Sequence, residues 1–355
     1  MNDINFSKLA KDIKTWGCEL GFQQIGISDI DLSEADGHLQ NWLDNNFHGE
    51  MDYMQRHGSM RSHPEELVPG TYRIISARMD YLPAEPQSIE VLNNSSLAYI
   101  SRYALGRDYH KVIRQRLQKL ANLIQESTGK FGYRALVDSA PVLERALAEK
   151  AGLGWIGKNT MLINKKAGSW FFLGELFTDL PLPTDTKDDD HCGTCSACLD
   201  VCPTDAFVGA NKLDARKCIS YLTIELRTSI PEELRPLMGN RVFGCDDCQL
   251  CCPWNKFSSP TKEKDFSPRH ELDRNELITL FNWTEEEFLE KTAGSSIRRI
   301  GYECWQRNLA IGLGNADSSP EIKAALQKKI NHPSALIKEH VEWALAQQKI
   351  FISPV

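Results

Sequence analysis

Nine of the eleven cysteines in this 355-residue chain lie between Cys192 and Cys252. The first four, Cys192 to Cys202, follow the pattern C-x2-C-x2-C-x3-C, and proline comes next. In proteins with two [4Fe-4S] clusters, this spacing places three thiolates on one cluster, while the thiolate before proline serves the other cluster. The segment therefore predicts a pair of iron–sulfur clusters that pass single electrons.

A second cysteine segment, from Cys245 to Pro253, completes the ligand count. It supplies two thiolates to the second cluster and returns one, directly before proline, to the first. Cys218 lies between the two segments and provides the remaining thiolate. The predicted ligands of cluster one are Cys192, Cys195, Cys198 and Cys252, and those of cluster two are Cys202, Cys218, Cys245 and Cys248.

Two alternatives to this assignment remain open. Cys251 can replace Cys218 or Cys248, although a ligand shared between the segments is expected directly before Pro253. Paired C-x2-C motifs also form zinc sites with four ligands each, but three thiolates at successive x2 spacing favour a cubane cluster. Cys18 and Cys304 lie outside the two segments and are expected to be small buried apolar side chains.

Most of the chain must serve some purpose other than holding clusters. Clusters relay electrons and carry out little covalent chemistry themselves, so the remainder is expected to hold a second cofactor and a substrate. The glycines of AGLGWIG, at 152, 154 and 157, have the spacing of a dinucleotide-binding motif. Their context is reversed, because a helical pattern precedes them and the strand-like TMLIN follows. The loop either admits a large flat ligand or lets a helix turn into a strand.

Asp138 is the first candidate for acid–base chemistry. It ends the strand-like segment that starts at Arg134, and Ser139 to Pro141 are expected to start a helix. Burial at a ligand cleft would raise the pKa of this carboxyl and make it a proton donor. The alternative is that Asp138 only caps the helix.

The elements that position these residues fall into three predicted domains. Residues 1–185 alternate helical and extended patterns, including a helix at 108–125 and a strand at 133–137, which indicates an α/β or α+β domain. The Pro- and Asp-rich segment 181–191 marks a boundary, and residues 186–260 form a ferredoxin-like double-cluster domain. Residues 275–355 read as paired helices of HEAT type, and Ser319 caps a helix that begins at Pro320.

Composition narrows the function classes. No stretch approaches the roughly 20 apolar residues of a membrane span, and residues 1–22 read as a surface helix rather than a signal peptide. We therefore expect a soluble cytoplasmic protein that makes no use of a membrane. The net charge of −7 argues weakly against nucleic acid, but residues 291–355 hold nine Lys and Arg against five Asp and Glu, a local charge of +4. This tail either faces RNA or is an ordinary solvated surface.

Several sequence blocks together resemble the epoxyqueuosine reductases. The blocks are SRYA at 101–104, GRDYH at 106–110, DSAPVLER at 138–145, GWIGKNT at 154–160, the two cysteine segments and CISYLTIE at 218–225. The resemblance covers nearly the whole chain in the order of that family. It implies a nitroreductase-like domain that binds cobalamin, two [4Fe-4S] clusters that feed cobalt, and a helical HEAT-like domain that contacts tRNA.

The implied reaction is reduction of the epoxide of epoxyqueuosine to the alkene of queuosine at the wobble position of tRNA, the final step of queuosine biosynthesis. The resemblance makes Asp138 the proton donor and leaves open whether cobalt attacks carbon or transfers electrons. It also implies an external low-potential electron donor, and we expect a monomer. The implied cofactor-binding residues are Arg61, Asp138, Lys158, Asn159, Ser220, Tyr221 and Glu225, and the expected tRNA contacts are Arg298 and Arg299.

Several of these expectations have an alternative, either another role for a residue or another function for the protein. Surface salt pairing is the alternative role for Arg61 and Lys158. One rival function is a reductive dehalogenase-like corrinoid enzyme that acts on a small molecule, although such proteins are usually exported and residues 1–22 contain no twin-arginine signal. Another is a cluster-bearing electron carrier, which leaves the Asp138 block and the glycine loop without a role.

Overall fold

The N-terminal half is built around a four-stranded sheet, in a computed structural model that describes residues 4–84 and 87–350. The strand order is β1 (Gln24–Ser28), β2 (Arg73–Asp80), β7 (Phe171–Thr178) and β4 (Tyr133–Leu136). Every pairing in this sheet is antiparallel. Because crossover helices join parallel strands, this pairing makes the domain α+β rather than α/β.

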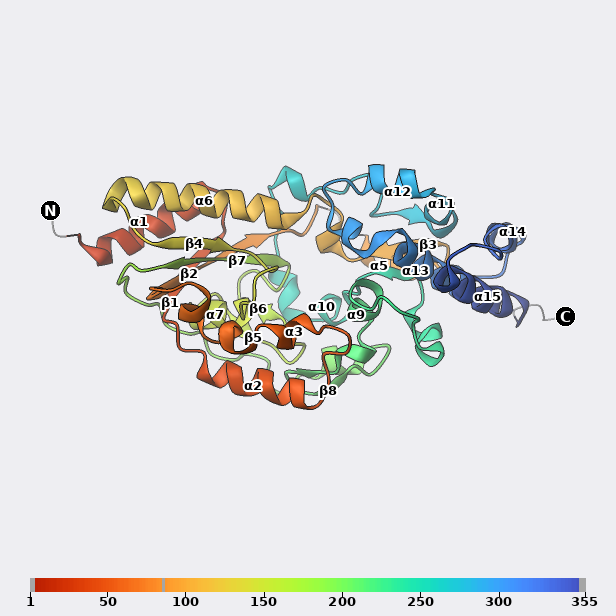
Figure 1. The fold of residues 1–355 in the computed structure, drawn as a ribbon, viewed down its shortest axis with the longest axis horizontal. Helices are drawn as coiled ribbons and strands as arrows, with labels where there is room; N and C mark the ends of the chain where they lie inside the picture. Colours follow the sequence, from red (N-terminus) through yellow and green to blue (C-terminus); the bar gives the residue numbers. More distant parts are fainter. Residues whose placement is uncertain (1–3, 85–86, 351–355) are drawn as a thin grey trace.

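Helices cover both faces of this sheet (Figure 1). α1 (Phe6–Glu19) and α6 (Tyr109–Thr128) lie on one face, and α7 (Glu144–Lys150) lies on the other. The alternation of side chains along a strand explains the two layers: Ile75 of β2 packs in the core with α1 and α6, whereas its neighbour Ile74 packs with Leu147 of α7. The central strands are thus buried on both sides.

The predicted helix at 108–125 is confirmed as α6, which runs on to Thr128. Asp108 caps it, since the side chain accepts a hydrogen bond from the backbone N–H of His110. Gly129 follows at φ 81°, a conformation that favours glycine and ends the helix. The helix thereby starts at the point where Asp108 and His110 can face Asp138.

A second, three-stranded sheet joins distant parts of the chain. β3 (Leu97–Ile100) lies in the centre, with β10 (Arg241–Phe243) parallel on one side and β11 (Asn275–Glu276) antiparallel on the other. The three strands come from the three predicted domain ranges, so these ranges share backbone hydrogen bonds. The boundaries at 185, 260 and 275 stay a prediction, and the expectation that the chain is wholly helical from 275 was wrong for β11.

The C-terminal region is otherwise helical, with α13 at its centre. Residues Cys304 to Gly314 of α13 are buried on all sides, as expected for a helix packed within a bundle. Ser319 does cap the helix that begins at Pro320, because its hydroxyl accepts from the N–H of Ile322. Residues 1–3 and 351–355 of the predicted terminal domains lie outside the described residues. The helices are α11 (Leu277–Phe281), α12 (Glu285–Lys291), α13 (Gly301–Asn315), α14 (Pro320–Lys328) and α15 (Ala335–Ile350).

Shorter elements connect these layers. None of the helices within the described ranges is both long and apolar enough to cross a bilayer. The remaining helices are α2 (Ser33–Asp44), α3 (Tyr53–Arg56), α4 (Pro64–Leu67), α5 (Ser88–Leu92), α8 (Ala197–Asp200), α9 (Ile219–Ile224) and α10 (Asp247–Leu250), and the remaining strands are β5 (Trp155–Ile156), β6 (Leu162–Ile163), β8 (Phe207–Gly209) and β9 (Lys212–Leu213).

One local prediction near the site needs correction. The helix after Asp138 starts at Glu144 rather than at Ser139, because residues 137–142 form tight turns with hydrogen bonds from Ser139 N to Val137 O and from Val142 N to Ala140 O. The glycine loop contains a strand of its own, β5, which pairs with β6 in a small hairpin. A Cβ at Gly154 would lie 2.1 Å from the carbonyl oxygen of Ile163, so the close approach of the two strands requires glycine there.

Candidate active site

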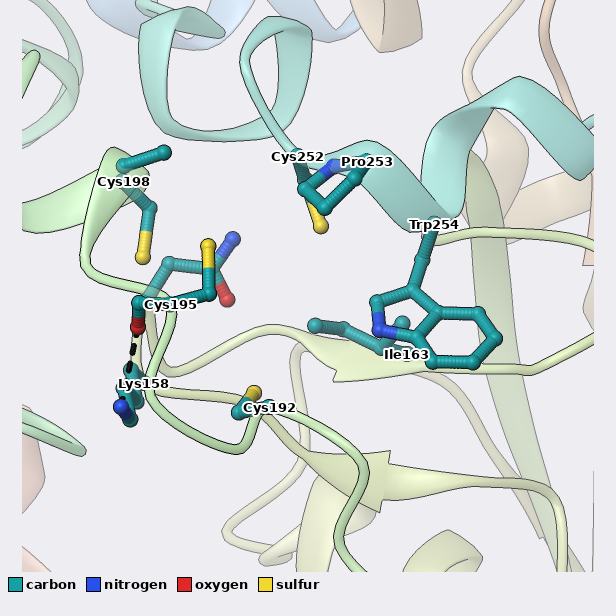
Figure 2. Close-up of a pocket in the computed structure, with 10 residues that line it drawn as sticks. Lys158, Ile163, Cys192, Cys195, Cys198, Cys252, Pro253 and Trp254 are labelled. Carbon is teal, nitrogen blue, oxygen red and sulfur yellow. Dashed lines mark hydrogen bonds between the residues drawn. The ribbon is translucent and has the colours of Figure 1, made fainter.

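The predicted ligands of cluster one surround a single cavity. Its lining includes Cys192, Cys195 and Cys198 of the first segment and Cys252 of the second. Figure 2 shows the four sulfur atoms facing a common space, with Trp254 and Ile163 closing one side. Four convergent thiols in a largely apolar cavity fit a [4Fe-4S] cluster, and the predicted crossing ligand before Pro253 lies at the same cavity.

The glycine hairpin holds the first cysteine segment in place. Lys158 donates from Nζ to the carbonyl oxygens of Gly193 (2.7 Å) and Cys195 (2.9 Å), the second of which is visible in Figure 2. The indole N–H of Trp155 donates to Sγ of Cys192 at 3.4 Å. An N–H directed at a sulfur stabilises a thiolate and tunes the potential of a bound cluster.

Asn159 makes the matching contact to the second cysteine segment. Its side-chain N–H donates to the carbonyl oxygen of Cys248 at 3.0 Å, and the residue is 3% exposed. The amine of Lys158 and the side-chain N–H of Asn159 are therefore engaged with the cysteine loops. These contacts favour a role in shaping the clusters' surroundings over the expected contact with a corrin, and they support the reading of the glycine loop as a helix-to-strand connection.

The predicted ligands of cluster two come from three separate segments. Cys218 is the N-cap residue of α9 and Cys245 directly follows the loop after β10. Burial raises the pKa of Cys218, and the charge of Cys202 raises it further. Burial likewise raises the pKa of Cys248, and Cys218 adds to the shift. A metal cluster would be needed to keep these buried thiols as thiolates.

Cys251 does not line the cavity that the predicted ligands of cluster one surround. Burial raises the pKa of its thiol to about 12, and Cys198 and Cys252 contribute to the rise. Its Sγ is 3.7 Å from the carbonyl oxygen of Cys248, and the residue is absent from the cavity lining given above. Of the two remaining cysteines, Cys304 is buried as expected, whereas the expectation for Cys18 was wrong because its side chain is exposed.

Asp138 receives two hydrogen bonds on one carboxylate oxygen. Nε2 of His110 lies 2.9 Å from Oδ2, and the hydroxyl of Tyr109 donates to the same atom at 3.0 Å. Nδ1 of His110 lies 2.6 Å from Oδ1 of Asp108. Asp138 is 55% exposed, whereas the His110 side chain is only 8% exposed. Asp108, His110 and Asp138 thus form an Asp108–His110–Asp138 chain of hydrogen bonds, and the Asp138 carboxylate at its end is exposed to solvent.

The negative charges of Asp108 and Asp138 favour a proton on His110. Burial opposes protonation of the imidazole, but the hydrogen bonds and charges of Asp108 and Asp138 outweigh it and raise the pKa of His110. Burial would raise the pKa of Asp138, but the hydrogen bond and charge of His110 lower it below its ordinary value. The expectation that burial raises the pKa of Asp138 was therefore wrong, because His110 provides a cationic partner.

Arg61, Tyr53 and Glu225 form a neighbouring polar group. The Arg61 guanidinium is 7% exposed, donates from Nη2 to the carbonyl oxygen of Tyr53 at 2.9 Å and lies over the Tyr53 ring. Burial raises the pKa of Tyr53, and the charges of Glu225 and Asp138 raise it further. The charge of Asp138 therefore affects the pKa of Arg61, of Tyr53 and of Glu225. Nε of Arg61 has no hydrogen-bond partner among the described residues.

The residues after Cys218 divide into two kinds. Glu225, at the end of α9, belongs to the group around Tyr53, and burial raises its pKa. Tyr221 is buried, and its hydroxyl accepts from the N–H of Glu50 at 2.8 Å. This hydrogen bond holds the loop before α3, and the expected cofactor contact of Tyr221 stays a prediction. Ser220 is half-buried, and its side chain forms a hydrogen bond with the Cys218 thiol that lowers the pKa of that thiol.

The two expected tRNA contacts lie on a 3-10 turn, Ser296–Ile300, just before α13. Nη2 of Arg299 is 3.3 Å from Oδ2 of Asp108, and the side chain is 49% exposed. Arg298 donates to the carbonyl oxygen of Leu289 at 2.7 Å. Through Arg299, the C-terminal region thus places a half-exposed positive charge beside Asp108, which is hydrogen-bonded to His110.

Sequence reasoning missed His110, Tyr109 and Tyr53 as site residues. The GRDYH block contains two of them, and an acidic residue two positions before a histidine at a helix start is a signal for an oriented imidazole. No pattern in the sequence connects this block to Asp138. That connection depends on the packing of α6 beside β4 in the sheet.

Two family models match the chain. The model described as "Epoxyqueuosine reductase QueG, DUF1730" matches residues 61–139, a range that begins at Arg61 and contains the Asp108–His110–Asp138 chain. The model described as "4Fe-4S double cluster binding domain" matches residues 191–255, which contain all the predicted cluster ligands. The presence of two [4Fe-4S] clusters follows from this match.

Whole-chain similarity decides the family. An epoxyqueuosine reductase of Pseudomonas aeruginosa is 65% identical over 340 residues, which is 96% of this chain and 94% of the relative. The chain belongs to the epoxyqueuosine reductase family. A member from Escherichia coli K12 is 58% identical over 346 residues, covering 97% of this chain and 91% of the relative. The chain is therefore an oxidoreductase of this family.

Solved structures of epoxyqueuosine reductases share the fold. The selenomethionine-labelled crystal structure aligns with a TM-score of 0.86 at 28% identity, covering 97% of this chain and 91% of that one. A crystal structure with a tRNA-Tyr epoxyqueuosine-modified tRNA stem loop aligns with a TM-score of 0.82 at 27% identity, covering 97% and 100%. The fold of family members thus extends over nearly the whole length of this chain.

Proposed function

We propose that this enzyme reduces the epoxide of epoxyqueuosine in tRNA to the alkene of queuosine, with Asp138 as the proton donor. The observation that carries the proposal is the Asp138 carboxylate, which meets His110 and Tyr109 on one oxygen and remains 55% exposed. Support for the substrate comes from a relative with the same fold, whose structure contains an epoxyqueuosine-modified tRNA stem loop. Because its substrate is tRNA, the enzyme is proposed to act in the cytoplasm.

Removal of the epoxide oxygen as water consumes two electrons and two protons. An acid must give a proton to the departing oxygen, since an alkoxide is a poor leaving group. Asp138 is the exposed member of its hydrogen-bonded chain and serves as that acid. His110, which holds the proton before the substrate binds, lies 2.9 Å from Oδ2 and supplies the proton that Asp138 delivers. Asp108 holds the imidazole in this orientation through Nδ1.

Cobalamin fits the polar group beside Asp138. The buried Arg61 guanidinium has an unused Nε, and such a donor suits the amide oxygens at the edge of a corrin. Tyr53 and Glu225, whose side chains are hydrogen-bonded to each other, provide further polar atoms of this group. Bound there, cobalamin would supply a low-potential cobalt centre for the reduction, and the two clusters would deliver its electrons from an external donor. Ser220 follows the cluster ligand Cys218 and stays a predicted cofactor contact.

A solved structure of a Bacillus subtilis relative has its aspartate-bearing catalytic loop swung out of the active site. We infer that residues 137–142 form the equivalent loop here, because they carry Asp138 and adopt tight turns between β4 and α7. Arg298 and Arg299, at the border with the helical region, are proposed to contact tRNA phosphates.

The deciding experiment is anaerobic reconstitution with iron, sulfide and cobalamin, followed by mass spectrometry of nucleosides from tRNA incubated with enzyme and reductant. Cobalamin-dependent conversion of epoxyqueuosine to queuosine is expected. Absence of conversion by enzyme that holds both clusters and corrinoid would refute the tRNA substrate and favour a small-molecule corrinoid reductase.

The role of Asp138 is tested in the same assay. Asp138→Asn keeps the size of the side chain but cannot give or receive the catalytic proton, so turnover should fall by roughly 10²- to 10⁴-fold. Iron and corrinoid content should match the wild type. Wild-type turnover by Asp138→Asn would exclude Asp138 as the proton donor.

A further inference from the structure

Asp138 has an unusual backbone conformation for a residue with a side chain. Its φ is 49°, and the N–H of Ser139 donates to the carbonyl oxygen of Val137 at 2.5 Å. Asp138 is therefore the central residue of a three-residue turn with positive φ, a turn type that is rare and strained. Strain of this kind persists only where the surroundings hold the residue in place.

One side chain is placed to hold this turn. Oε1 of Glu144 accepts a hydrogen bond from the backbone N–H of Asp138 at 2.6 Å. This N–H has left the sheet, because the pairing of β4 with β7 ends at Leu136. Glu144 is the first residue of α7, and Leu147 in the same helix is completely buried against the sheet. The carboxyl group thus connects the turn at Asp138 to α7, which is packed against the sheet.

We propose that Glu144 is a positioning residue for the reaction: its carboxyl group holds the Asp138 turn so that Oδ2 meets His110 and Tyr109. The inference rests on the proposed role of Asp138 as proton donor. Glu144 touches the backbone of Asp138 rather than the carboxylate, so it acts through Asp138 and does not itself exchange the catalytic proton. Loss of its hydrogen bond would release the strained turn and withdraw the acid from His110.

The protonation of Glu144 agrees with this role. The charged groups around it are Asp138, His110, Arg145 and the buried Glu175. Burial raises the pKa of Glu144 to about 8, and the charge of Asp138 acts in the same direction. A neutral carboxylic acid still accepts through its carbonyl oxygen but does not repel the Asp138 carboxylate. Glutamine has the same acceptor and the same lack of charge, which provides a conservative test.

The experiment compares Glu144→Ala, Glu144→Gln and the control Glu126→Ala, which removes an exposed carboxylate near the other end of α6. Steady-state kinetics with epoxyqueuosine tRNA at pH 7 should show a loss of about 10- to 100-fold in kcat for Glu144→Ala, because misplacing a catalytic group is costly. The KM for tRNA should stay within about twofold, since Glu144 is not in contact with bound RNA in this proposal. Glu144→Gln should recover most of the lost kcat, and Glu126→Ala should match the wild type.

Crystal structures of the two Glu144 variants provide a readout that is independent of turnover. In Glu144→Ala the distance from His110 Nε2 to Asp138 Oδ2 should exceed hydrogen-bonding range, and in Glu144→Gln it should stay near 2.9 Å. An unmoved Asp138 with unchanged kcat in Glu144→Ala would overturn the proposal, as would a loss of kcat that Glu144→Gln fails to restore. Wild-type enzyme that converts no tRNA, combined with a displaced Asp138 in Glu144→Ala, would refute the proposed function and leave the positioning role standing.

Discussion

At the residue scale, the hydrogen-bonding partners of the Asp138 carboxylate decide the direction of its pKa shift, and burial does not. His110 and Tyr109 supply two donors to Oδ2, and the imidazole is held from behind by Asp108. The positive partner keeps the pKa of Asp138 low in the absence of substrate. A proton stored on His110 and an ionised Asp138 form a pair that can exchange one proton without net change of charge.

The raised pKa of Glu144 leads to a prediction about stability and pH. The folded value of about 8 lies above the ordinary 4.5, so folding favours the neutral form, and the stability linked to it is lost as pH rises toward 8. Glutamine cannot ionise. The free energy of unfolding of Glu144→Gln should therefore increase relative to wild type between pH 5 and about 8, as measured by urea titration at each pH. A constant difference across this range would contradict the raised pKa.

At the element scale, the β5–β6 hairpin and the two cysteine segments form one unit. Lys158 and Asn159 reach from the hairpin to carbonyl oxygens in opposite cysteine segments. On the far side, Asp246 next to Cys245 accepts hydrogen bonds from Tyr99 and Ser101 at the end of β3. Short loops rich in thiols gain their shape from these polar contacts, since they bury little apolar surface of their own.

The ligand assignment gives a prediction at this scale. Cys251→Ser should keep the full iron content after anaerobic reconstitution, because Cys252 and not Cys251 lines the first cavity. Cys218→Ser should lose iron from cluster two, since serine is a poor ligand for a cluster that thiolates hold. Iron analysis and electron paramagnetic resonance of the reduced proteins measure both effects. Iron loss in Cys251→Ser with full content in Cys218→Ser would reverse the assignment.

At the scale of the whole molecule, α13 ties the helical region to the cluster region. The Arg307 side chain is completely buried, and its guanidinium donates to the carbonyl oxygens of Leu222, Leu226 and Thr228. Two of these carbonyls lie at or just after the end of α9, where helix carbonyls lack partners. Since α9 begins directly after Cys218, the helical region supports a predicted cluster ligand from behind.

Removal of the Arg307 guanidinium should therefore destabilise the protein. Arg307→Met preserves the stem but leaves buried carbonyl groups unsatisfied, at roughly 1–3 kcal/mol each. We expect a clear fall in the thermal unfolding midpoint and faster loss of iron from cluster two under chelation. Lys328→Met, on the exposed side of α14, is the control and should change neither. Equal midpoints for the two variants would disprove the bracing role of Arg307.

Arg299 is the proposed tRNA contact in the same region. Its half-exposed guanidinium lies beside Asp108, and we expect it to bind a phosphate of the tRNA. Arg299→Gln should weaken tRNA binding and reduce the slope of log K against log salt by roughly one. Filter binding at several salt concentrations measures the slope. An unchanged slope would remove Arg299 from the RNA contacts.

The sequence by itself determined the chemistry that depends on local spacing. The cysteine pattern predicts cluster ligands because a cubane is wrapped by thiolates close together in the sequence, and Cys252 does share a cavity with the three cysteines that the pattern groups with it. The amphipathic helix at 109–128 and the Ser319 cap follow from patterns within one element. The blocks around Asp138 and Cys218 also pointed to the family.

Only the tertiary structure decided which distant residues meet. Asp138 is joined to His110 because α6 packs beside β4, and Lys158 and Asn159 face cysteine loops because a hairpin forms within the glycine segment. β3, β10 and β11 pair across residues 97–276. Such contacts are fixed by packing and by the satisfaction of buried backbone groups, which depend on the whole fold. The pKa of Asp138 is lowered rather than raised as expected for the same reason, since its cationic partner lies 28 residues away in the sequence.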